Sequence, residues 1–293
     1  YLIVIERDGW YVRPDGEETK EPILVDKCNF SFALRGEHIK LDYALITVHG
    51  TPGENGLLQG YLDLVGVPYN TGGTLTEALT FNKYYCNRYL STYPNLRVAD
   101  SIRLLRNGFR PSSEELIKRL GLPLFAKPNA GGSSVATSKV ESLEALDKAV
   151  ALAFDECDEV LLERFIAGTE VTCGCYRIGD TITALPVTEV VPKNSFFDFE
   201  AKYNGAVEEI TPARISPELT ALIQELTREI YQHIDARGII RVDYIIEADG
   251  RPTLLEVNTT PGMTPTSFIP QQVKAAGLTM QDLLTDLIQD HLS

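Results

Sequence analysis

A predicted β-hairpin near the C-terminus places four polar side chains where their neighbours are apolar. The stretch RVDYIIEADGRPTLLEVN has apolar residues on both sides of Asp249-Gly250, a dipeptide typical of two-residue turns. That turn pairs Asp243 with Glu256 and Arg241 with Asn258. Directly opposed side chains have Cβ atoms roughly 4.5–5.5 Å apart, so the two carboxylates repel each other unless a cation lies between them.

These four side chains have two interpretations. Carboxylate and amide oxygens on a strand pair suit Mg²⁺, which keeps several waters and is usually completed by substrate phosphates. Asp243, Glu256 and Asn258 are then the candidate ligands, and Arg241 adds a fixed positive charge beside them. The alternative is a solvated sheet face whose charges avoid each other. A one-residue slip in register would also move one strand's side chains to the other face.

A second candidate is a phosphate-binding loop. The segment LFAKPNAGGSSVATSK has a lysine, Lys127, at the end of a predicted strand, followed by a Gly- and Ser-rich loop. Successive backbone N–H groups in such loops can hold phosphate oxygens, and Ser133 and Ser134 add hydroxyls. No Gly-Lys-Ser/Thr ends the loop, so it is not a Walker A motif. Taken alone, an ordinary hairpin turn is the more common explanation.

Two further motifs carry polar residues that indicate a site only in combination with the hairpin and the phosphate loop. HGTPGENG follows a predicted strand, and its His49 could orient a substrate. ERFIAGTE places Glu163 and Glu170 at the ends of a short connection. Taken singly, a loop histidine and plain surface charge are the better explanations.

Two loops complete the set. FFDFEAKY lies in a long connection between Pro192 and Pro212, which predicts either a lid or a floppy connection. NTTPGMTPTS follows the second hairpin strand and could direct N–H groups at a carboxylate. Together the motifs amount to a phosphate loop, a lysine, a strand pair with two carboxylates, and a lid.

The order of predicted elements indicates three parts. Residues 1–76 read as an α/β unit with an opening hairpin turning at Asp8-Gly9, buried strands at DYALITVHG and VPYN, and a helix between them. Residues 77–163 read as a second unit, with a helix near 76–89 and another capped by Ser113. Residues 164–293 carry antiparallel strands and two long helices. The first of these helices is capped by Ser216, and its predicted buried stripe is Leu219, Leu222, Ile223, Leu226, Ile230 and Ile234.

Composition excludes several classes of protein. The chain has 293 residues, 44% of them hydrophobic and 23% charged, which is ordinary for a globular protein. The net charge of −14 argues against a nucleic-acid partner or an anionic membrane surface. No apolar run approaches the roughly 20 residues that cross a bilayer. Five Cys without a CxxC pair predict neither a disulfide framework nor a zinc site, and favour the cytoplasm.

The motifs, taken in their order, resemble the D-alanine–D-alanine ligases of the ATP-grasp superfamily. HGTPGENGLLQGYLDLVGVPY, KPNAGGSSV, EAKY, RVDY and LEVNTTPGMTPTS match family motifs, and the resemblance runs from about Asp42 to the C-terminus. It implies an ATP-grasp fold of α/β and α+β class, with an N-terminal α/β substrate domain and two α+β sub-domains that enclose ATP. The implied reaction is ATP-dependent formation of D-alanyl-D-alanine through an acyl phosphate, for peptidoglycan precursors, in the bacterial cytoplasm.

The resemblance also implies a role for each motif residue. Asp243, Glu256 and Asn258 would bind two Mg²⁺, or Mn²⁺ instead, while Arg241 and the N–H of Gly262 would stabilise the tetrahedral oxyanion. Ser267 would hold the carboxylate of the second substrate beside Phe268, and His49 would help to position substrate. The implied nucleotide contacts are Lys83, Lys127, Ser134, Glu163 (adenine), Glu170 (ribose) and Lys202. Ser133 and Tyr203 would link the phosphate loop to the lid. The implied partners are ATP, D-alanine and a second copy of the chain.

Several positions depart from the family pattern. The family's N-terminal Gly-rich loop, with a Glu for the ammonium of the first alanine, is not in this sequence, and because the chain begins at Tyr1 we expect that this segment is missing. Phe197 and Phe199 replace common Tyr residues, and Ala136 replaces a Gly. Tyr203 favours a dipeptide product over D-alanine–D-lactate and, more weakly, over D-alanine–D-serine. A nucleotide-binding protein without ligase activity is the alternative from another class.

Overall fold

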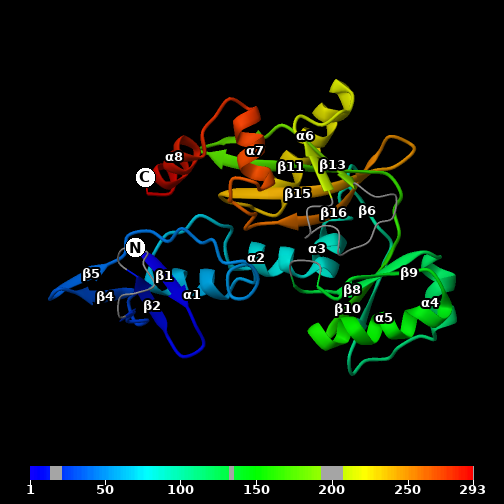
Figure 1. Ribbon diagram of the computed structural model, residues 1–293, viewed down its shortest axis with the longest axis horizontal. Helices are drawn as coiled ribbons and strands as arrows, with labels where there is room; N and C mark the ends of the chain where they lie inside the picture. Colours follow the sequence, from blue (N-terminus) through cyan, green and yellow to red (C-terminus); the bar gives the residue numbers. More distant parts are fainter. Residues whose placement is uncertain (14–21, 132–134, 193–206, 293) are drawn as a thin grey trace.

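The computed structural model describes residues 1–13, 22–131, 135–192 and 207–292. Figure 1 shows three groups of elements: small sheets with one helix at the N-terminal end, a four-stranded sheet with two helices at the other end, and a large sheet that lies across both. Helices α2 (Thr74–Phe81) and α3 (Lys83–Leu90) connect the groups. This mixed arrangement agrees with the predicted α/β and α+β class.

The N-terminal group is built from two small antiparallel sheets. Strands β1 (Leu2–Ile5), β2 (Trp10–Arg13) and β3 (Ile23–Leu24) form one, β4 (Ser31–Leu34) and β5 (Glu37–Lys40) form the other, and α1 (Leu57–Val65) packs against them. The predicted opening hairpin is confirmed, because Ile5 pairs with Trp10. Its turn is one residue earlier than expected, because the N–H of Glu6 donates to the carbonyl of Gly9.

The expected strands at DYALITVHG and VPYN are reduced to one parallel bridge between Ala44 and Tyr69. The Asn70 side chain supplies the contacts that a strand partner would make. Its Oδ1 accepts from the N–H of Ile46 at 2.5 Å, and its Nδ2 donates to the Ile46 carbonyl at 3.2 Å. One side chain thus satisfies both backbone groups of Ile46, so no longer ladder is needed there.

The second group is an antiparallel sheet in the order β7 (Ser101–Leu105), β10 (Glu159–Arg164), β8 (Leu124–Pro128), β9 (Ser138–Val140). Helices α4 (Ser113–Leu120) and α5 (Leu143–Glu156) bury an apolar face against it. The predicted cap of α4 is off by one residue. Ser112, not Ser113, accepts from the N–H of Glu115, and the Glu115 carboxylate accepts from the N–H of Ser112 in return, which is a capping box.

The single helix expected near 76–89 is two helices. Asn82 lies between them with extended backbone (φ −89°, ψ 95°), and its side chain accepts from the N–H of Tyr85 to cap α3. The break makes Lys83 the first residue of α3. Cys86 and Leu90 of α3 join the core of the large sheet.

The large sheet carries the predicted metal hairpin at its centre. Its order is β14 (Val207–Ile210), β13 (Thr188–Pro192), β11 (Thr169–Ile178), β15 (Ile239–Ile246), β16 (Pro252–Asn258), β6 (Arg97–Val98), and β12 (Thr181–Ala184) also pairs with β11. Ile240, Val242 and Tyr244 of β15 share a buried cluster with α6 (Pro217–His233). The odd-numbered residues of β15, Arg241 and Asp243 among them, therefore face the other side of the sheet.

Two shorter helices cover part of that other side. Helices α7 (Phe268–Ala275) and α8 (Met280–Leu292) pack with Ile239 in a separate cluster. The sequence did not predict α7, because its apolar residues follow a loop rich in Gly, Pro and Thr. The predicted stripe of α6 is correct for Ile223, Leu226, Ile230 and Ile234, which are buried, and wrong for Leu222, which is 38% exposed. Within the described ranges, no helix is long and apolar enough to cross a membrane.

Gly238 brings the large sheet close to the N-terminal group. Its backbone has φ +63°, and a Cβ there would lie 1.6 Å from the carbonyl oxygen of Asn70. We expect Gly238→Ala to lower the free energy of unfolding by more than about 3 kcal/mol, because it adds a backbone clash to left-handed strain. Gly250 (φ +77°) has no atom within 4 Å of its Cβ position, so Gly250→Ala is the matched control. That control should cost only about 1–2 kcal/mol.

Chemical unfolding in urea measures both variants. Equal losses for Gly238→Ala and Gly250→Ala would contradict a close contact between Gly238 and Asn70.

Candidate active site

The register of the hairpin is as predicted where it carries the polar residues. Asp243 pairs with Glu256, and Arg241 pairs with Asn258. The turn itself differs, because the N–H of Glu247 donates to the carbonyl of Arg251 and leaves three residues in the loop. A bulge between Asp243 and Tyr244 absorbs that extra residue. The two irregularities cancel, so both carboxylates stay directly opposed.

Asp243 is the most heavily bonded group of the site. The residue is 8% exposed. Arg241 contacts it with two donors, Nε to Oδ1 at 2.9 Å and a terminal nitrogen to Oδ2 at 2.8 Å. Thr172 Oγ1 donates to Oδ1 at 2.6 Å, and Asn258 Nδ2 donates to Oδ2 at 3.2 Å. Burial alone would lower the pKa of Arg241, but the adjoining Asp243 more than offsets it and the pKa is raised. The guanidinium is therefore permanently charged.

Glu256, the second carboxylate, is balanced by Lys83. Lys83 Nζ lies 4.0 Å from Glu256 Oε2, and the glutamate side chain is 38% exposed. The same Nζ donates to the carbonyl of Gly131 at 2.8 Å, so Lys83 connects the hairpin to the predicted phosphate loop. Burial lowers the pKa of Lys83, while Glu256 works to raise it.

Lys127 and Glu163 form a close ion pair on neighbouring strands. Lys127 Nζ lies 2.7 Å from Glu163 Oε2, and Asn87 Nδ2 donates to Oε1 at 3.3 Å. Glu163 is 3% exposed. The structure thus brings together two of the residues that the sequence assigned to the nucleotide, here as partners of each other.

The loop after the hairpin carries the residues assigned to the second substrate. Ser267 precedes α7, and its Oγ lies 2.8 Å from Thr264 Oγ1. Gly262 faces it so closely that a Cβ would lie 2.7 Å from Ser267 Oγ. Phe268 lies under Arg241, with 5.3 Å from the guanidinium carbon to the ring centroid. Arg241 therefore contacts both the carboxylate strand and the substrate loop.

The remaining predicted site residues make fewer contacts with the hairpin. His49 is exposed, and no contact ties it to the hairpin among the described residues. Glu170 lies on β11 opposite Ile245, near enough to help raise the pKa of Arg241. Ser133, Ser134, Lys202 and Tyr203 lie outside the described residues, as do Phe197 and Phe199.

Sequence reasoning missed two glutamates near this site. Glu54, in the His49 loop, accepts from the N–H of Gly50 at 2.6 Å. Glu77 on α2 is fully buried and accepts a short hydrogen bond from Thr259, the residue after Asn258. Burial raises the pKa of Glu77 to about 8, and the charge of Glu54 adds to this against the opposing hydrogen bond from Thr259. A glutamate in the first turn of an amphipathic helix looks like ordinary helix sequence, so no local pattern indicated its role.

Comparisons with known proteins agree with this geometry. A family model described as D-ala D-ala ligase C-terminus matches residues 92–289. A D-alanine–D-alanine ligase of Porphyromonas gingivalis is 63% identical over 293 residues, 100% of this chain and 88% of that protein. The structure of the VanG D-Ala:D-Ser ligase of Enterococcus faecalis matches with a TM-score of 0.84 and 32% identity, over 99% of this chain and 88% of that one. A Bacillus anthracis D-alanine–D-alanine ligase solved with ATP matches with a TM-score of 0.73 and 28% identity, over 86% and 79% of the two chains.

The fold is that of an ATP-grasp protein. More narrowly, the family model and the relatives show that the chain belongs to the D-alanine–D-alanine ligase family.

The raised pKa of Glu77 predicts a pH-dependent stability. The folded state keeps the Glu77 proton up to about pH 8, whereas the unfolded chain loses it near the ordinary value of 4.5. The contribution of this group is present below the unfolded pKa and is lost as the pH rises towards 8. Glutamine still accepts from Thr259 but cannot ionise. We therefore expect the unfolding free energy of Glu77→Gln, relative to the parent protein, to improve by at least about 1.4 kcal/mol between about pH 5.5 and pH 8.5.

Urea unfolding at both pH values measures the difference. Glu225→Gln, on the exposed face of α6, is the control and should show no such trend. A Glu77→Gln difference that does not vary with pH would mean that Glu77 is already ionised in the folded protein.

Proposed function

We propose that this chain joins two D-alanine molecules into D-alanyl-D-alanine at the expense of ATP. The carboxylate of the first D-alanine attacks the γ-phosphate, which gives an acyl phosphate and ADP. The amine of the second D-alanine then attacks that carbonyl, and inorganic phosphate leaves. The observation that carries the proposal is the hairpin itself, where Arg241, Asp243, Glu256 and Asn258 meet beside the Gly262–Ser267 loop. The role in the cell would be the supply of peptidoglycan precursors in the bacterial cytoplasm.

Lysines from two elements support the nucleotide part of the proposal. Lys83 reaches the carbonyl of Gly131 at the start of the predicted phosphate loop, and Lys127 lies on β8, the strand that leads into the same loop. Both would contact the phosphates, together with Ser134 and Lys202. Glu163 would accept from the adenine amine and Glu170 from the ribose. Lys127 and Glu163 now neutralise each other, so a bound nucleotide has to separate them.

Arg241 and the substrate loop support the transfer step. A charged guanidinium and the N–H of Gly262 would both donate to the oxyanion that forms when the amine attacks. Ser267, next to Gly262, would hold the carboxylate of the second substrate, with Phe268 as the wall beneath it. His49 would position substrate, and Ser133 and Tyr203 would join the phosphate loop to the lid.

The donor set of the hairpin suits a hard divalent cation. Among the described residues, no three His, Cys, Asp or Glu side chains gather at one point. Two carboxylates and one amide are nevertheless what Mg²⁺ uses when waters and phosphates complete its shell. Asp243 already accepts four hydrogen bonds, one of them from the Asn258 amide nitrogen. Turning that amide over would remove one of the two hydrogen bonds to Asp243 Oδ2 and present an oxygen of Asn258 to a cation. Two Mg²⁺, or Mn²⁺ in their place, would neutralise phosphate charge during transfer.

A homodimer is the proposed assembly. Its support is apolar surface on α1 and α2, where Leu57, Leu64 and Leu75 are 63%, 89% and 80% exposed. The two helices follow each other along the chain and contact one another, so a second copy could cover both at once.

The reaction is tested by phosphate release with Mg²⁺, ATP and one of three acceptors: D-alanine, D-serine or D-lactate. We expect release that depends on D-alanine and a product with the mass of the dipeptide. Faster product formation with D-serine than with D-alanine would establish D-serine as the second substrate, as the name of the VanG ligase indicates for that protein. Nucleotide binding without phosphate release from any acceptor would contradict a ligase and leave a nucleotide-binding relative.

The metal assignment is tested by removing one ligand. Glu256→Gln should raise the Mg²⁺ concentration for half-maximal velocity by at least about tenfold and lower kcat, because one anionic ligand becomes neutral. Glu247→Gln lies on the same hairpin and removes a carboxylate that pairs with Arg97 at 3.0 Å and Thr253 at 2.5 Å. This control should leave the Mg²⁺ dependence unchanged. The same Mg²⁺ dependence in both variants would show that Glu256 is not a ligand.

A further inference from the structure

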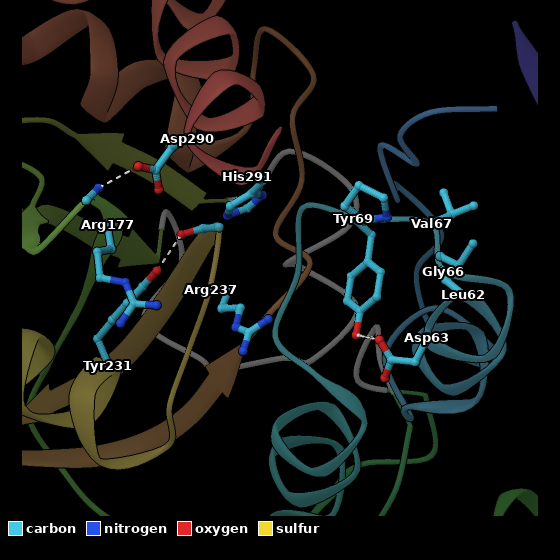
Figure 2. Close-up of a pocket in the computed structure, with 13 residues that line it drawn as sticks. Leu62, Asp63, Gly66, Val67, Tyr69, Arg177, Tyr231, Arg237, Asp290 and His291 are labelled. Carbon is cyan, nitrogen blue, oxygen red and sulfur yellow. Dashed lines mark hydrogen bonds between the residues drawn. The ribbon is translucent and has the colours of Figure 1, made fainter. Parts of the chain in front are cut away.

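A cavity of about 520 Å³ lies between the N-terminal group and the large sheet. Figure 2 shows the residues that line it. One wall comes from the end of α1 and residues 66–69, and the other from the end of β11, residues 237–238 and the end of α8. The candidate active-site residues are absent from its described lining. Its volume is within the range of about 300–1,000 Å³ in which proteins bind metabolite-sized molecules.

Two arginines give the cavity a positive side. Arg177 is half-buried at the end of β11, and Arg237 follows α6. Within the described part of the chain, neither guanidinium has a carboxylate within ion-pair distance. Both lie near His291: burial lowers the pKa of this histidine, the charge of Asp290 opposes the shift, and the charges of Arg237 and Arg177 both add to it. In a chain with a net charge of −14, two arginines without counter-ions beside one cavity call for an explanation.

The acidic residues of the lining are engaged with other donors. Asp63 accepts from the Tyr69 hydroxyl at 2.9 Å, and Asp290 accepts from the N–H of Gly179 at 2.8 Å. In Figure 2 the Arg237 guanidinium lies between Arg177 on one side and the Tyr69–Asp63 pair on the other. Both guanidiniums keep their fork of N–H donors for a ligand.

We propose that this cavity is a second ligand site, which holds the phosphate group of a small phosphorylated molecule between Arg177 and Arg237. A phosphate monoester carries close to two negative charges at neutral pH, which matches two guanidiniums, and arginine binds phosphate with paired hydrogen bonds. The organic part of the molecule lies beside Gly66 and Pro68, which are exposed and half-buried in the lining. With a volume of about 520 Å³, the cavity is larger than inorganic phosphate alone fills.

The position of the cavity gives the ligand a structural effect. Gly238, in the lining, directly precedes β15, which carries Arg241 and Asp243. Its backbone also touches Asn70, which precedes α2. A ligand that contacts both walls therefore stabilises the junction that holds the hairpin against the N-terminal group, and raises the thermal midpoint of the protein.

The site is tested by arginine labelling with phenylglyoxal, read out by peptide mass spectrometry. Saturating ADP and Mg²⁺ are present throughout, so that the nucleotide site is filled. Glucose 6-phosphate is the probe, with glucose, inorganic phosphate and citrate at equal concentration. We expect glucose 6-phosphate to slow the labelling of Arg177 and Arg237 at least fivefold, and to raise the thermal midpoint. Labelling of Arg110, which pairs with Asp147 on the second sheet group, should not change.

Variants separate binding from general effects. Arg177→Met and Arg237→Met should each weaken probe binding by at least about tenfold, the loss expected for a hydrogen bond to a charged group. Arg110→Met is the matched control. No protection by glucose 6-phosphate in the parent protein, or a rise in the thermal midpoint that persists in the double methionine variant, would overturn the site. Equal protection by inorganic phosphate would overturn the subsite for the organic part, and protection by citrate alone would overturn the choice of phosphate.

Discussion

The two-donor contact between Arg241 and Asp243 is the interaction on which the rest of the site depends. Asp243 is nearly buried, and four of its hydrogen bonds come from Thr172, Arg241 and Asn258 on three strands. Removing one partner of such a pair leaves an uncompensated charge, which typically costs about 3–5 kcal/mol. The same guanidinium lies over Phe268, the first residue of α7. Arg241 thus fixes β15 and the start of α7, where the substrate loop ends, relative to each other.

The sequence predicted this register correctly, although the path of the chain between the two carboxylates differs from the prediction. An Asp-Gly dipeptide favours a two-residue turn, whereas the structure has a three-residue loop and a compensating bulge. Alternation of apolar residues reports which face a side chain occupies, and that is fixed by burial. The alternation does not reveal an extra residue in the loop when an extra residue on the partner strand restores the pairing.

Contacts between distant parts of the chain could not be predicted in the same way. Thr259 and Glu77 are 182 residues apart, and Lys83 reaches Gly131 across 48 residues. Periodicity within a window of one or two turns carries no information about such pairs. The helix break at Asn82 was missed for a related reason. Its amide oxygen accepts from the N–H of Tyr85, which caps α3, and also from Nδ2 of Asn129, the residue after β8. The roles of Glu163, Glu170 and Ser267 came from the family resemblance, because their local sequence is unremarkable.

The charges of the site are arranged as internal pairs. Arg241 pairs with Asp243, Lys83 with Glu256, and Lys127 with Glu163. Each basic side chain proposed to bind the nucleotide or the oxyanion is thus paired with a carboxylate proposed to bind metal or nucleotide. Without such pairing, the buried carboxylates Asp243 and Glu163 would be left uncompensated. Binding of a nucleotide with its metal would then exchange partners rather than create charge contacts from nothing. The proposed Mg²⁺ would take the place of Lys83 beside Glu256, while the phosphates would take the place of the carboxylates beside the lysines. The affinity for nucleotide is on this account a difference in free energy between two sets of ion pairs.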